Sequence, residues 1–398
     1  MRVLQINSVC GSGSTGNICV GINKEINKVS GYDGRIVYFW GKDCSEGTRL
    51  SNEIYEKSQA LLSRLTGKYG FVSHLNSKKV IKYIKSFKPD IVHLHNVHDH
   101  TLNIEMLLQY LAENKIKVVW TFHDCWAFTA YCANFSFKGC YKWKKECKNC
   151  SEFHKYSWFF DRSNYLYNSK KELLRKLDLH IVTPSNWLKE LVQDSYLNKK
   201  DIQVIYNGID LNVFKPTFSD FRKKYNIENK FMLLGVAFDW NFKKGIDVFI
   251  KLANLLDDSY QIVLVGTNNK IDKMLPKNVI SIHRTNDISE LAEIYTAADL
   301  FVNPTREEVL GMVNIESLAC GTPVIMFNTG GAPECINNDC GVVLKNNNVN
   351  DLLDGIIKIK NGGGFSSNQC IDYATQFDQK VKYNSYLELY REIMETKK

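Results

Sequence analysis

Short apolar runs alternate with amphipathic stretches along most of the chain. The chain opens with the strand-like runs VLQIN (3–7) and RIVYFW (35–40), which a helix-like stretch separates. In the second half, ISELAEIYTAA (288–298) has helical periodicity and precedes the apolar run LFVNP (300–304). Because strand and helix patterns alternate along the chain, the sequence predicts an α/β protein with parallel sheets.

The pattern divides into two halves. The first series of strands ends with HIVTPSNWL (180–188), and FMLLGVAF (231–238) begins a second series. At about 100–200 residues per domain, a chain of 398 residues allows two domains. We expect one domain over 1–210, a second over 211–375 and a C-terminal helix over 376–398 that packs back on the first.

Two glutamates give the strongest chemical signal. Glu308 lies in a predicted strand-to-helix loop, and Glu316 lies eight residues later on the predicted helix. The amides of Leu310, Gly311 and Met312 would emerge at the helix start, where unsatisfied donors and the helix dipole favour a phosphate. A carboxylate on each side of an anion site suits a nucleotide sugar, although two such glutamates without this context are usually solvated surface residues.

The loop DWNFKKG (239–245) is a second candidate for phosphate binding. Lys243 and Lys244 precede Gly245 at a strand-to-helix turn, where a lysine can neutralise a diphosphate as a point charge. The alternative is a pair of ordinary exposed lysines.

A glycine-rich loop follows the first strand. Gly11, Gly13 and Gly16 match G-x-G-x-x-G by count, but Trp40 and Gly41 stand where a ribose-binding acid would be expected. A tight turn and a contact with a diphosphate or acceptor both stay open, with Gly16 as the candidate ligand-side residue.

Histidines gather where predicted strands end. In DIVHLHNVHDH (90–100), we interpret His93 and His95 as structural, whereas His98 and Asp99 lie past the strand end and are candidates to line an acceptor site.

The next strand, KVVWTFHDCW (117–126), ends in His123 and Asp124. A histidine at this position can donate to a sugar hydroxyl or stabilise charge in a transition state. Asp124 joins the acceptor-side candidates, and a buried structural histidine is the alternative for His123.

An insertion over 125–155 interrupts the strand-helix alternation. It holds four cysteines at the spacing C-x7-C-x6-C-x2-C. In a cytosolic chain such a cluster favours a structural zinc site over disulfides, and free thiols are the alternative. The four candidate ligands are Cys132, Cys140, Cys147 and Cys150.

Charge is distributed unevenly over the two halves. The formal net charge is +8, but residues 1–200 carry 30 Lys and Arg against 18 Asp and Glu, whereas residues 201–398 carry 21 against 25. The predicted helix 77–88 places four lysines away from its apolar face, which indicates attraction to an anionic membrane surface or an ordinary solvated helix. No nucleic-acid-binding motif accompanies this charge, so we expect no nucleic-acid partner.

No apolar stretch approaches the ~18–20 residues of a membrane span. The first strand begins almost at Met1, which leaves no room for a signal peptide. We therefore expect a cytoplasmic protein. Peripheral association with the inner face of the cytoplasmic membrane is a further hypothesis, which depends on the basic charge of the first half.

Several of these motifs together resemble retaining glycosyltransferases of family 4. The resemblance rests on Glu308-x7-Glu316 with the run ESLACGTPV (316–324), on the His123-Asp124 strand end, and on TPSNWL (183–188) followed by VIYNGID (204–210). It covers nearly the whole chain, and the cysteine insertion is similar to that of a subset of the family. The resemblance implies the GT-B fold, with two Rossmann-like doubly wound domains facing across a cleft and the donor held mainly by the second.

The resemblance also implies roles for single residues. Phe238 departs from the pattern, because an arginine is common at that position, and Lys243 and Arg306 are the cations expected to compensate. Lys244 and the helix-start amides would stabilise a leaving diphosphate, Glu308 and His123 would orient the donor sugar, Glu316 would hold the ribose, and Gly16 would approach the phosphates.

These expectations define a reaction. A UDP- or GDP-sugar would donate its sugar to a hydroxyl of a glycan or lipid-linked acceptor in surface polysaccharide biosynthesis, with retention of configuration. No cofactor is expected to be required for catalysis. The rivals are a nucleotide-sugar epimerase or phosphorylase on the same fold, and a catalytically silent sugar-binding scaffold.

Overall fold

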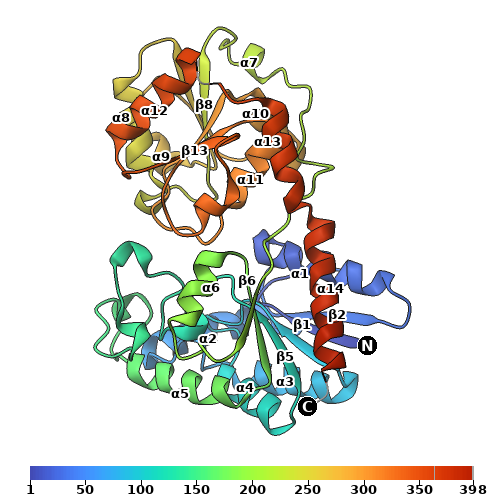
Figure 1. The fold of residues 1–398 in the computed structure, drawn as a ribbon. Coiled ribbons are helices and arrows are strands. Elements are labelled where there is room, and N and C mark those ends of the chain that lie inside the picture. Colours follow the sequence, from blue (N-terminus) through green and yellow to red (C-terminus); the bar gives the residue numbers. More distant parts are fainter. Residues whose placement is uncertain (363, 397–398) are drawn as a thin grey trace. The chain divides into compact units, whose positions relative to one another are not determined.

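The computed structural model describes residues 1–362 and 364–396, which form two compact units (Figure 1). The first unit contains Met1–Tyr206 and the C-terminal stretch from Lys382, and the second contains Asn207–Val381. Each unit is built on a sheet whose named strands all pair in parallel, as the alternation of strand and helix patterns predicts.

The first unit has a seven-stranded sheet in the order β3-β2-β1-β4-β5-β6-β7. Because β1 lies between β2 and β4, the strand order reverses beside it, and the carboxyl ends of strands at such a point are where α/β proteins bind ligands. The strands are β1 (Arg2–Ile6), β2 (Asp33–Tyr38), β3 (Thr48–Arg49), β4 (Ile91–Leu94), β5 (Lys117–Thr121), β6 (Leu179–Thr183) and β7 (Asp201–Val204).

Helices cover this sheet, and the last of them comes from the C-terminal end of the chain. In this last helix, α14 (Gln379–Glu395), the side chains of Tyr383, Tyr386 and Tyr390 are buried and belong to the same core cluster as Val3 and Ile18. The helices are α1 (Gly13–Lys28), α2 (Glu53–Thr66), α3 (His74–Phe87), α4 (Ile104–Glu113), α5 (Ser163–Lys176), α6 (Asn186–Gln193) and α14 (Gln379–Glu395).

The cysteine insertion contains four short 3-10 turns, η1 (Trp126–Phe128), η2 (Ser136–Lys138), η3 (Lys142–Lys144) and η4 (Phe153–Lys155). Phe128, Phe135 and Trp143 pack on one another and are buried, with centroids 4.9 Å apart for Phe135 and Trp143. These aromatic side chains therefore form a small core of the insertion.

The second unit has a six-stranded sheet in the order β10-β9-β8-β11-β12-β13, with a reversal beside β8. Its core lies between the sheet and two helices, α8 (Ile246–Leu255) and α12 (Val349–Gly362), and includes Phe249, Leu264 and Ile356. The strands are β8 (Phe231–Val236), β9 (Tyr260–Val265), β10 (Val279–Ile282), β11 (Leu300–Asn303), β12 (Val324–Phe327) and β13 (Gly341–Leu344).

The helices of the second unit follow its strands in alternation. They are α7 (Phe221–Lys224), α8 (Ile246–Leu255), α9 (Asn269–Asp272), α10 (Ile288–Ala297), α11 (Met312–Ala319), α12 (Val349–Gly362) and α13 (Ser367–Ala374), with the turns η5 (Phe242–Lys244), η6 (Ala332–Cys335) and η7 (Thr375–Phe377). Throughout the described part of the chain, every helix is too short or too polar to cross a membrane.

Candidate functional site

In the second unit, Lys244 and Glu308 form an ion pair. Lys244 Nζ donates to Glu308 Oε2 at 2.8 Å, and both side chains are partly exposed. Lys244 ends the η5 turn after β8, where Asn241 accepts hydrogen bonds from the amides of Lys243 and Lys244. Glu308 follows β11, which is a neighbour of β8 in the sheet. The structure thus brings together the predicted diphosphate lysine and the predicted sugar-binding glutamate.

The start of α11 lies beside this ion pair, and its N-cap position, 311, requires glycine. Gly311 has a φ of 89°, and a Cβ at this position would lie 2.7 Å from Asn314 Nδ2. Asn303 Nδ2 donates to Asn314 Oδ1 at 2.8 Å and fixes that side chain in the interior. A Cβ on Gly330 would lie 1.8 Å from the carbonyl oxygen of Glu308, so the turn at Gly330 packs directly against the backbone of this loop.

Glu316 lies one turn further along α11. Tyr295 Oη, from α10, donates to Glu316 Oε2 at 3.0 Å. Burial raises the pKa of Glu316 to about 7, although the bond from Tyr295 works in the opposite direction. Near neutral pH, Glu316 therefore exchanges between a neutral acid and a carboxylate that can accept bonds from two hydroxyls.

The two cations expected to replace the arginine at position 238 are engaged elsewhere. Lys243 forms an ion pair with Glu307, whose side chain is buried. Arg306 donates two hydrogen bonds to Asp247, at 2.7 and 2.8 Å, and its guanidinium lies 4.1 Å from the ring centroid of Phe242. Both residues hold the loops around η5 together.

A third cation, Arg284, is placed beside Phe238. Its guanidinium carbon lies 5.9 Å from the Phe238 ring centroid, and the Phe238 side chain is 92% exposed. The sequence analysis did not select Arg284, because the residue follows β10 and belongs to no motif. Only the sheet order, in which β10, β9 and β8 are successive neighbours, brings its loop near the loop after β8.

In the first unit, His93 has a structural role, as its pattern predicts. It is buried, and its ring nitrogens bond to Tyr390 Oη at 2.7 Å and to Thr121 Oγ1 at 2.8 Å. Both ring nitrogens are thus satisfied within the core.

A hydrogen-bond relay sets the tautomer of His123. Gln5 Nε2 donates to the carbonyl of Cys19 at 3.0 Å, so Gln5 Oε1 accepts from His95 Nε2 at 3.1 Å. Burial lowers the pKa of His95, so its Nδ1 carries no proton and accepts from His123 Nε2 at 3.1 Å. Burial also lowers the pKa of His123 to about 4. His123 is therefore neutral with a lone pair on Nδ1, so this nitrogen can accept a hydrogen bond. The role of His123 toward a donor sugar stays a prediction.

The three acceptor-side candidates form one cluster. His98 Nε2 lies 3.0 Å from Asp124 Oδ2, and His98 Nδ1 lies 2.9 Å from Asp99 Oδ1. Burial opposes a charge on this ring, but the two aspartates outweigh it and raise the pKa of His98 to about 10. Tyr69 also donates to Asp99. His98 is thus a cation held between two carboxylates, and this His98 cluster (His98, Asp99 and Asp124) adjoins a small cavity past the ends of β4 and β5 that His95 and His123 also line.

The glycine-rich loop closes on itself. Gly11 N donates to the carbonyl of Gly16 at 3.2 Å, and a Cβ on Gly16 would lie 3.2 Å from Gly11 N. Close packing within the turn accounts for the small residue at position 16. The contact of Gly16 with a phosphate stays a prediction.

The four cysteines of the insertion lie near one another. The pKa of Cys132 is raised, mainly by a hydrogen bond with Cys150 and next by burial. The negative charges of the Cys150, Cys147 and Cys140 thiolates raise it further. All four side chains are partly exposed. As placed in the described part of the chain, no three His, Cys, Asp or Glu side chains surround a position for a metal ion.

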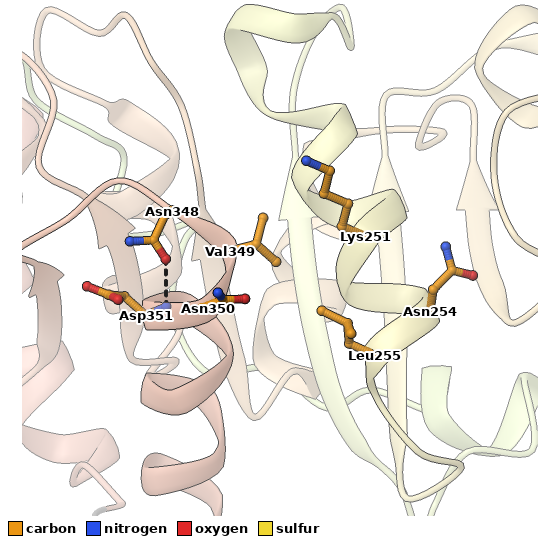
Figure 2. A pocket seen from close by; sticks show the side chains of 7 residues that line it. All are labelled: Lys251, Asn254, Leu255, Asn348, Val349, Asn350 and Asp351. Atoms are coloured by element: carbon orange, nitrogen blue, oxygen red, sulfur yellow. Dashed lines mark hydrogen bonds between the residues drawn. The ribbon is translucent and has the colours of Figure 1, made fainter.

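A separate pocket lies between α8 and the start of α12 (Figure 2). Leu255 and Lys251 extend from α8 on the side of residues 348–351, and Asn254 also lines the pocket. At the start of α12, Asn348 Oδ1 accepts from Asp351 N at 2.9 Å. This pocket contains none of the predicted site residues. It also lies at the C-terminal end of α8, whereas Lys244 precedes the helix start, so we do not assign the chemistry to it.

Two family models match most of the chain. The model described as "Glycosyltransferase Family 4" matches residues 45–213, and the model described as "Glycosyl transferases group 1" matches residues 217–377. The boundary between the matches lies near the boundary between the two compact units.

Related proteins come from bacterial polysaccharide and glycan assembly. A candidate colanic acid biosynthesis glycosyl transferase of Escherichia coli K12, WcaC, is 22% identical over 372 residues, which are 89% of each chain. The N,N'-diacetylbacillosaminyl-diphospho-undecaprenol alpha-1,3-N-acetylgalactosaminyltransferase of Campylobacter jejuni is 27% identical over 58% of this chain and 65% of its own length.

Solved structures share the fold. The structure of Anabaena HepE in complex with UDP and glucose has a TM-score of 0.69 at 16% identity and covers 98% of this chain and 99% of its own. Its sequence is too distant to show more than the GT-B fold. With both halves matched by family models, and with both parallel sheets in place, this chain belongs to glycosyltransferase family 4.

Proposed function

We propose that the protein is a retaining hexosyltransferase that uses a UDP- or GDP-sugar and acts on a glycan or lipid-linked acceptor in surface polysaccharide biosynthesis. The observation that carries this proposal is the Lys244–Glu308 ion pair beside the Gly311 helix start, with Glu316 further along the same helix. These groups offer a cation, amide donors and two carboxylates, which are what a nucleotide diphosphate sugar requires.

Donor binding would exchange the partners of the ion pair. The diphosphate is a stronger partner for Lys244 than the single Glu308 carboxylate, because it carries more charge and also reaches the amides of Gly311 and Met312. Glu308 is then available to accept hydrogen bonds from sugar hydroxyls, and Glu316 to accept those of the ribose diol. The same cation and amides stabilise the diphosphate as it leaves.

Retention follows from a front-face reaction. An oxygen of the departing phosphate takes the proton of the acceptor hydroxyl while that hydroxyl attacks the anomeric carbon from the same side. The reaction then requires no protein carboxylate as base, and the chain contributes charge stabilisation and orientation. In support, the name of the Campylobacter relative specifies an alpha linkage and an undecaprenol diphosphate-linked acceptor.

We assign the first unit to sugar hydroxyls. His123 has an acceptor lone pair on Nδ1, and the His98 cluster presents two carboxylates around one cation. Such a cluster can accept bonds from an acceptor hydroxyl and orient it without binding a second phosphate, since its net charge is negative.

We also propose a structural zinc ion for the insertion, held by Cys132, Cys140, Cys147 and Cys150. A long segment with only short 3-10 turns gains most from such a ligand. The fully buried Lys170 of α5 donates to the Trp126 carbonyl at 2.6 Å; burial lowers the pKa of Lys170 to about 7, and the charges of Cys147 and Cys132 act in the opposite direction. The thiols must reorient to bind zinc. Elemental analysis of protein purified without chelator should give one zinc per chain, and its absence would remove this part of the proposal.

The deciding experiment is a screen of nucleotide sugars. We expect one UDP- or GDP-sugar to raise the melting temperature and to be hydrolysed slowly without acceptor. Glu308→Gln and Lys244→Ala should each lower turnover by about 10²-fold or more, as loss of a transition-state contact does. An epimerised nucleotide sugar, or dependence on inorganic phosphate, would favour the rivals on this fold. Unchanged activity in both variants would favour a non-catalytic scaffold.

A further inference from the structure

Helix α2 of the first unit carries its apolar side chains outward. Its buried residues are Glu56 and Ser63, whereas Ile54 is 84% exposed. The spacing of the exposed large side chains places them on one stripe of the helix. They are Ile54, Leu61, Leu62 and Leu65.

The inward polar face fixes this orientation. Glu56 Oε1 accepts from Asn76 Nδ2 at 2.8 Å in the interior, and Glu56 Oε2 lies 3.7 Å from His100 Nε2. Rotation of α2 to bury its leucines would break the buried bond to Asn76 and expose its partner. The outward apolar stripe is therefore a stable feature of the fold.

A second exposed apolar segment adjoins the C-terminal end of α2. Trp158, Phe159 and Phe160 follow one another, and Phe159 is 64% exposed. Trp158 N donates to the carbonyl of Arg64 at 2.8 Å, and Arg64 Nη1 donates to the carbonyl of Lys155 at 3.4 Å. We call the four outward residues of α2 together with Trp158, Phe159 and Phe160 the α2 patch.

The two segments that carry the α2 patch are rich in exposed basic side chains. The exposed carboxylates over residues 53–68 and 153–162 are those of Glu53 and Asp161, and Asp161 accepts bonds from the amides of Cys150 and Ser163. The exposed basic residues over the same two segments are Lys57, Arg64, Lys68, Lys155 and Arg162, of which Lys155 forms an ion pair with Glu152 just before the second segment.

We propose that the α2 patch docks the protein on an anionic lipid bilayer. Leucine and aromatic side chains with lysine and arginine beside them are typical of surfaces that enter the boundary between headgroups and acyl chains. A second copy of the chain fits less well, because a symmetric contact would place this basic surface against itself. The predicted membrane helix 77–88 lacks such a patch, since Val80, Ile84 and Phe87 of α3 are buried.

Resting on the proposed function, docking also positions the acceptor site. Tyr69, two residues past the end cap of α2, donates to Asp99 of the His98 cluster. Tyr156, two residues before Trp158, packs edge-on against Tyr69 with centroids 5.0 Å apart. The same two segments therefore carry the α2 patch and support the His98 cluster. A lipid-linked sugar can then reach this cluster while its lipid stays in the bilayer.

Vesicle co-sedimentation of the full chain tests the proposal. We expect binding to vesicles of phosphatidylglycerol and phosphatidylethanolamine, and at least tenfold weaker binding to phosphatidylcholine vesicles. The triple variant Leu61→Ser, Leu65→Ser, Phe159→Ser should bind the anionic vesicles at least tenfold more weakly than the wild type. Lys57→Glu with Arg64→Glu should abolish the preference for anionic lipid. Phe218→Ser, at a 90% exposed aromatic residue of the second unit, should bind as the wild type does.

Two results would overturn the proposal. One is equal vesicle binding by the wild type and the triple variant, both shown to be folded by their melting curves. The other is a wild type that is a dimer in sedimentation equilibrium and a triple variant that is a monomer, which would assign the α2 patch to a second copy.

Stabilisation by nucleotide sugars without vesicles gives an independent readout of the proposed function. If the wild type binds vesicles but no nucleotide sugar stabilises it, the result counts against the enzyme assignment alone. If a nucleotide sugar stabilises the wild type but vesicles do not bind it, the result counts against docking alone.

Discussion

Single residues of the candidate sites derive their chemistry from neighbours on other elements. Lys244 and Glu308 are 64 positions apart, and their 2.8 Å contact exists because β8 and β11 are adjacent strands. His98 is an ordinary histidine in the sequence, and two carboxylates from different loops make it a cation with a pKa of about 10. The function of these residues is thus set by which charges surround them.

Glu316 should make donor binding dependent on pH. Its pKa in the folded protein is raised to about 7, and only the carboxylate accepts from both ribose hydroxyls. Donor affinity should therefore fall as the pH drops below 7, approaching tenfold per pH unit. Isothermal titration between pH 5.5 and 8.5 measures this dependence. Glu316→Gln should bind weakly at every pH in that range, and a wild-type affinity that does not change with pH would contradict the prediction.

Glu316 should also make the free energy of unfolding depend on pH, in the direction opposite to its effect on donor affinity. A raised pKa means that the folded protein binds this proton more tightly than the unfolded chain. The stability that Glu316 contributes is therefore present below its ordinary pKa of 4.5 and is lost as the pH rises through about 7. In urea unfolding without ligand, Glu316→Gln should lose less stability than the wild type over this range.

Arg284 should contribute to donor affinity in place of the arginine expected at position 238. Arg284→Ala should weaken binding of the nucleotide sugar by about 10- to 100-fold, because a hydrogen bond to a charged group contributes about 1.5–3 kcal/mol. Adding Phe238→Arg to that variant should restore affinity. Lys251→Ala, in the pocket of Figure 2, is the matched control and should leave affinity unchanged. Full affinity in Arg284→Ala would exclude this role.

At the scale of elements, two glycines shape the loop between β11 and α11. Gly311 adopts a left-handed conformation at the helix start, and Gly330 packs against the backbone of Glu308. Sequence periodicity predicted the strand and the helix here. The close approach of Gly330, which lies after the next strand, required the packed unit.

Gly330→Ala should displace Glu308. The added Cβ would lie 1.8 Å from the Glu308 carbonyl at a φ of +58°, so the loop must move. We expect a lower melting temperature and a loss of activity that the stability loss alone does not explain, measured well below the melting transition. Gly364→Ala has no atom within 4 Å of its added Cβ and serves as the control. Normal activity in Gly330→Ala would show that the position of this loop is unimportant.

At the scale of the molecule, the chain returns to its first unit at the end. The buried tyrosines of α14 complete the core around Val3 and Ile18, and Tyr390 also bonds to His93. The first unit is therefore assembled from both ends of the sequence.

A chain shortened after Asp378 should lose the stability of the first unit selectively. Removing α14 exposes the apolar cluster that includes Ile22, Ile26 and Val182. Limited proteolysis should then cut within 1–206 at least tenfold faster, while fragments of 207–378 persist. A chain shortened after Glu395 keeps α14 and should resist proteolysis as the full chain does. Equal resistance of the chain that lacks α14 would show that the helix is dispensable.

The sequence alone determined the fold class and the principal motifs. Runs of apolar residues report burial one segment at a time, so the parallel strands, the Glu308-x7-Glu316 loop and helix, and the His123-Asp124 strand end could all be read locally. Both family models agree with that interpretation. Periodicity also located the helix predicted at 77–88. It did not show that the apolar side chains of this helix, Val80, Ile84 and Phe87, are buried in the core.

Only the tertiary structure decided which side chains meet. It paired Lys243 and Arg306 with carboxylates, placed Arg284 beside Phe238, and set the acceptor lone pair of His123 through Gln5 and His95. It also turned the leucines of α2 outward around the buried Glu56. The physical reason is that pairing, tautomer and orientation depend on neighbours from distant parts of the chain, which no local pattern of residues encodes.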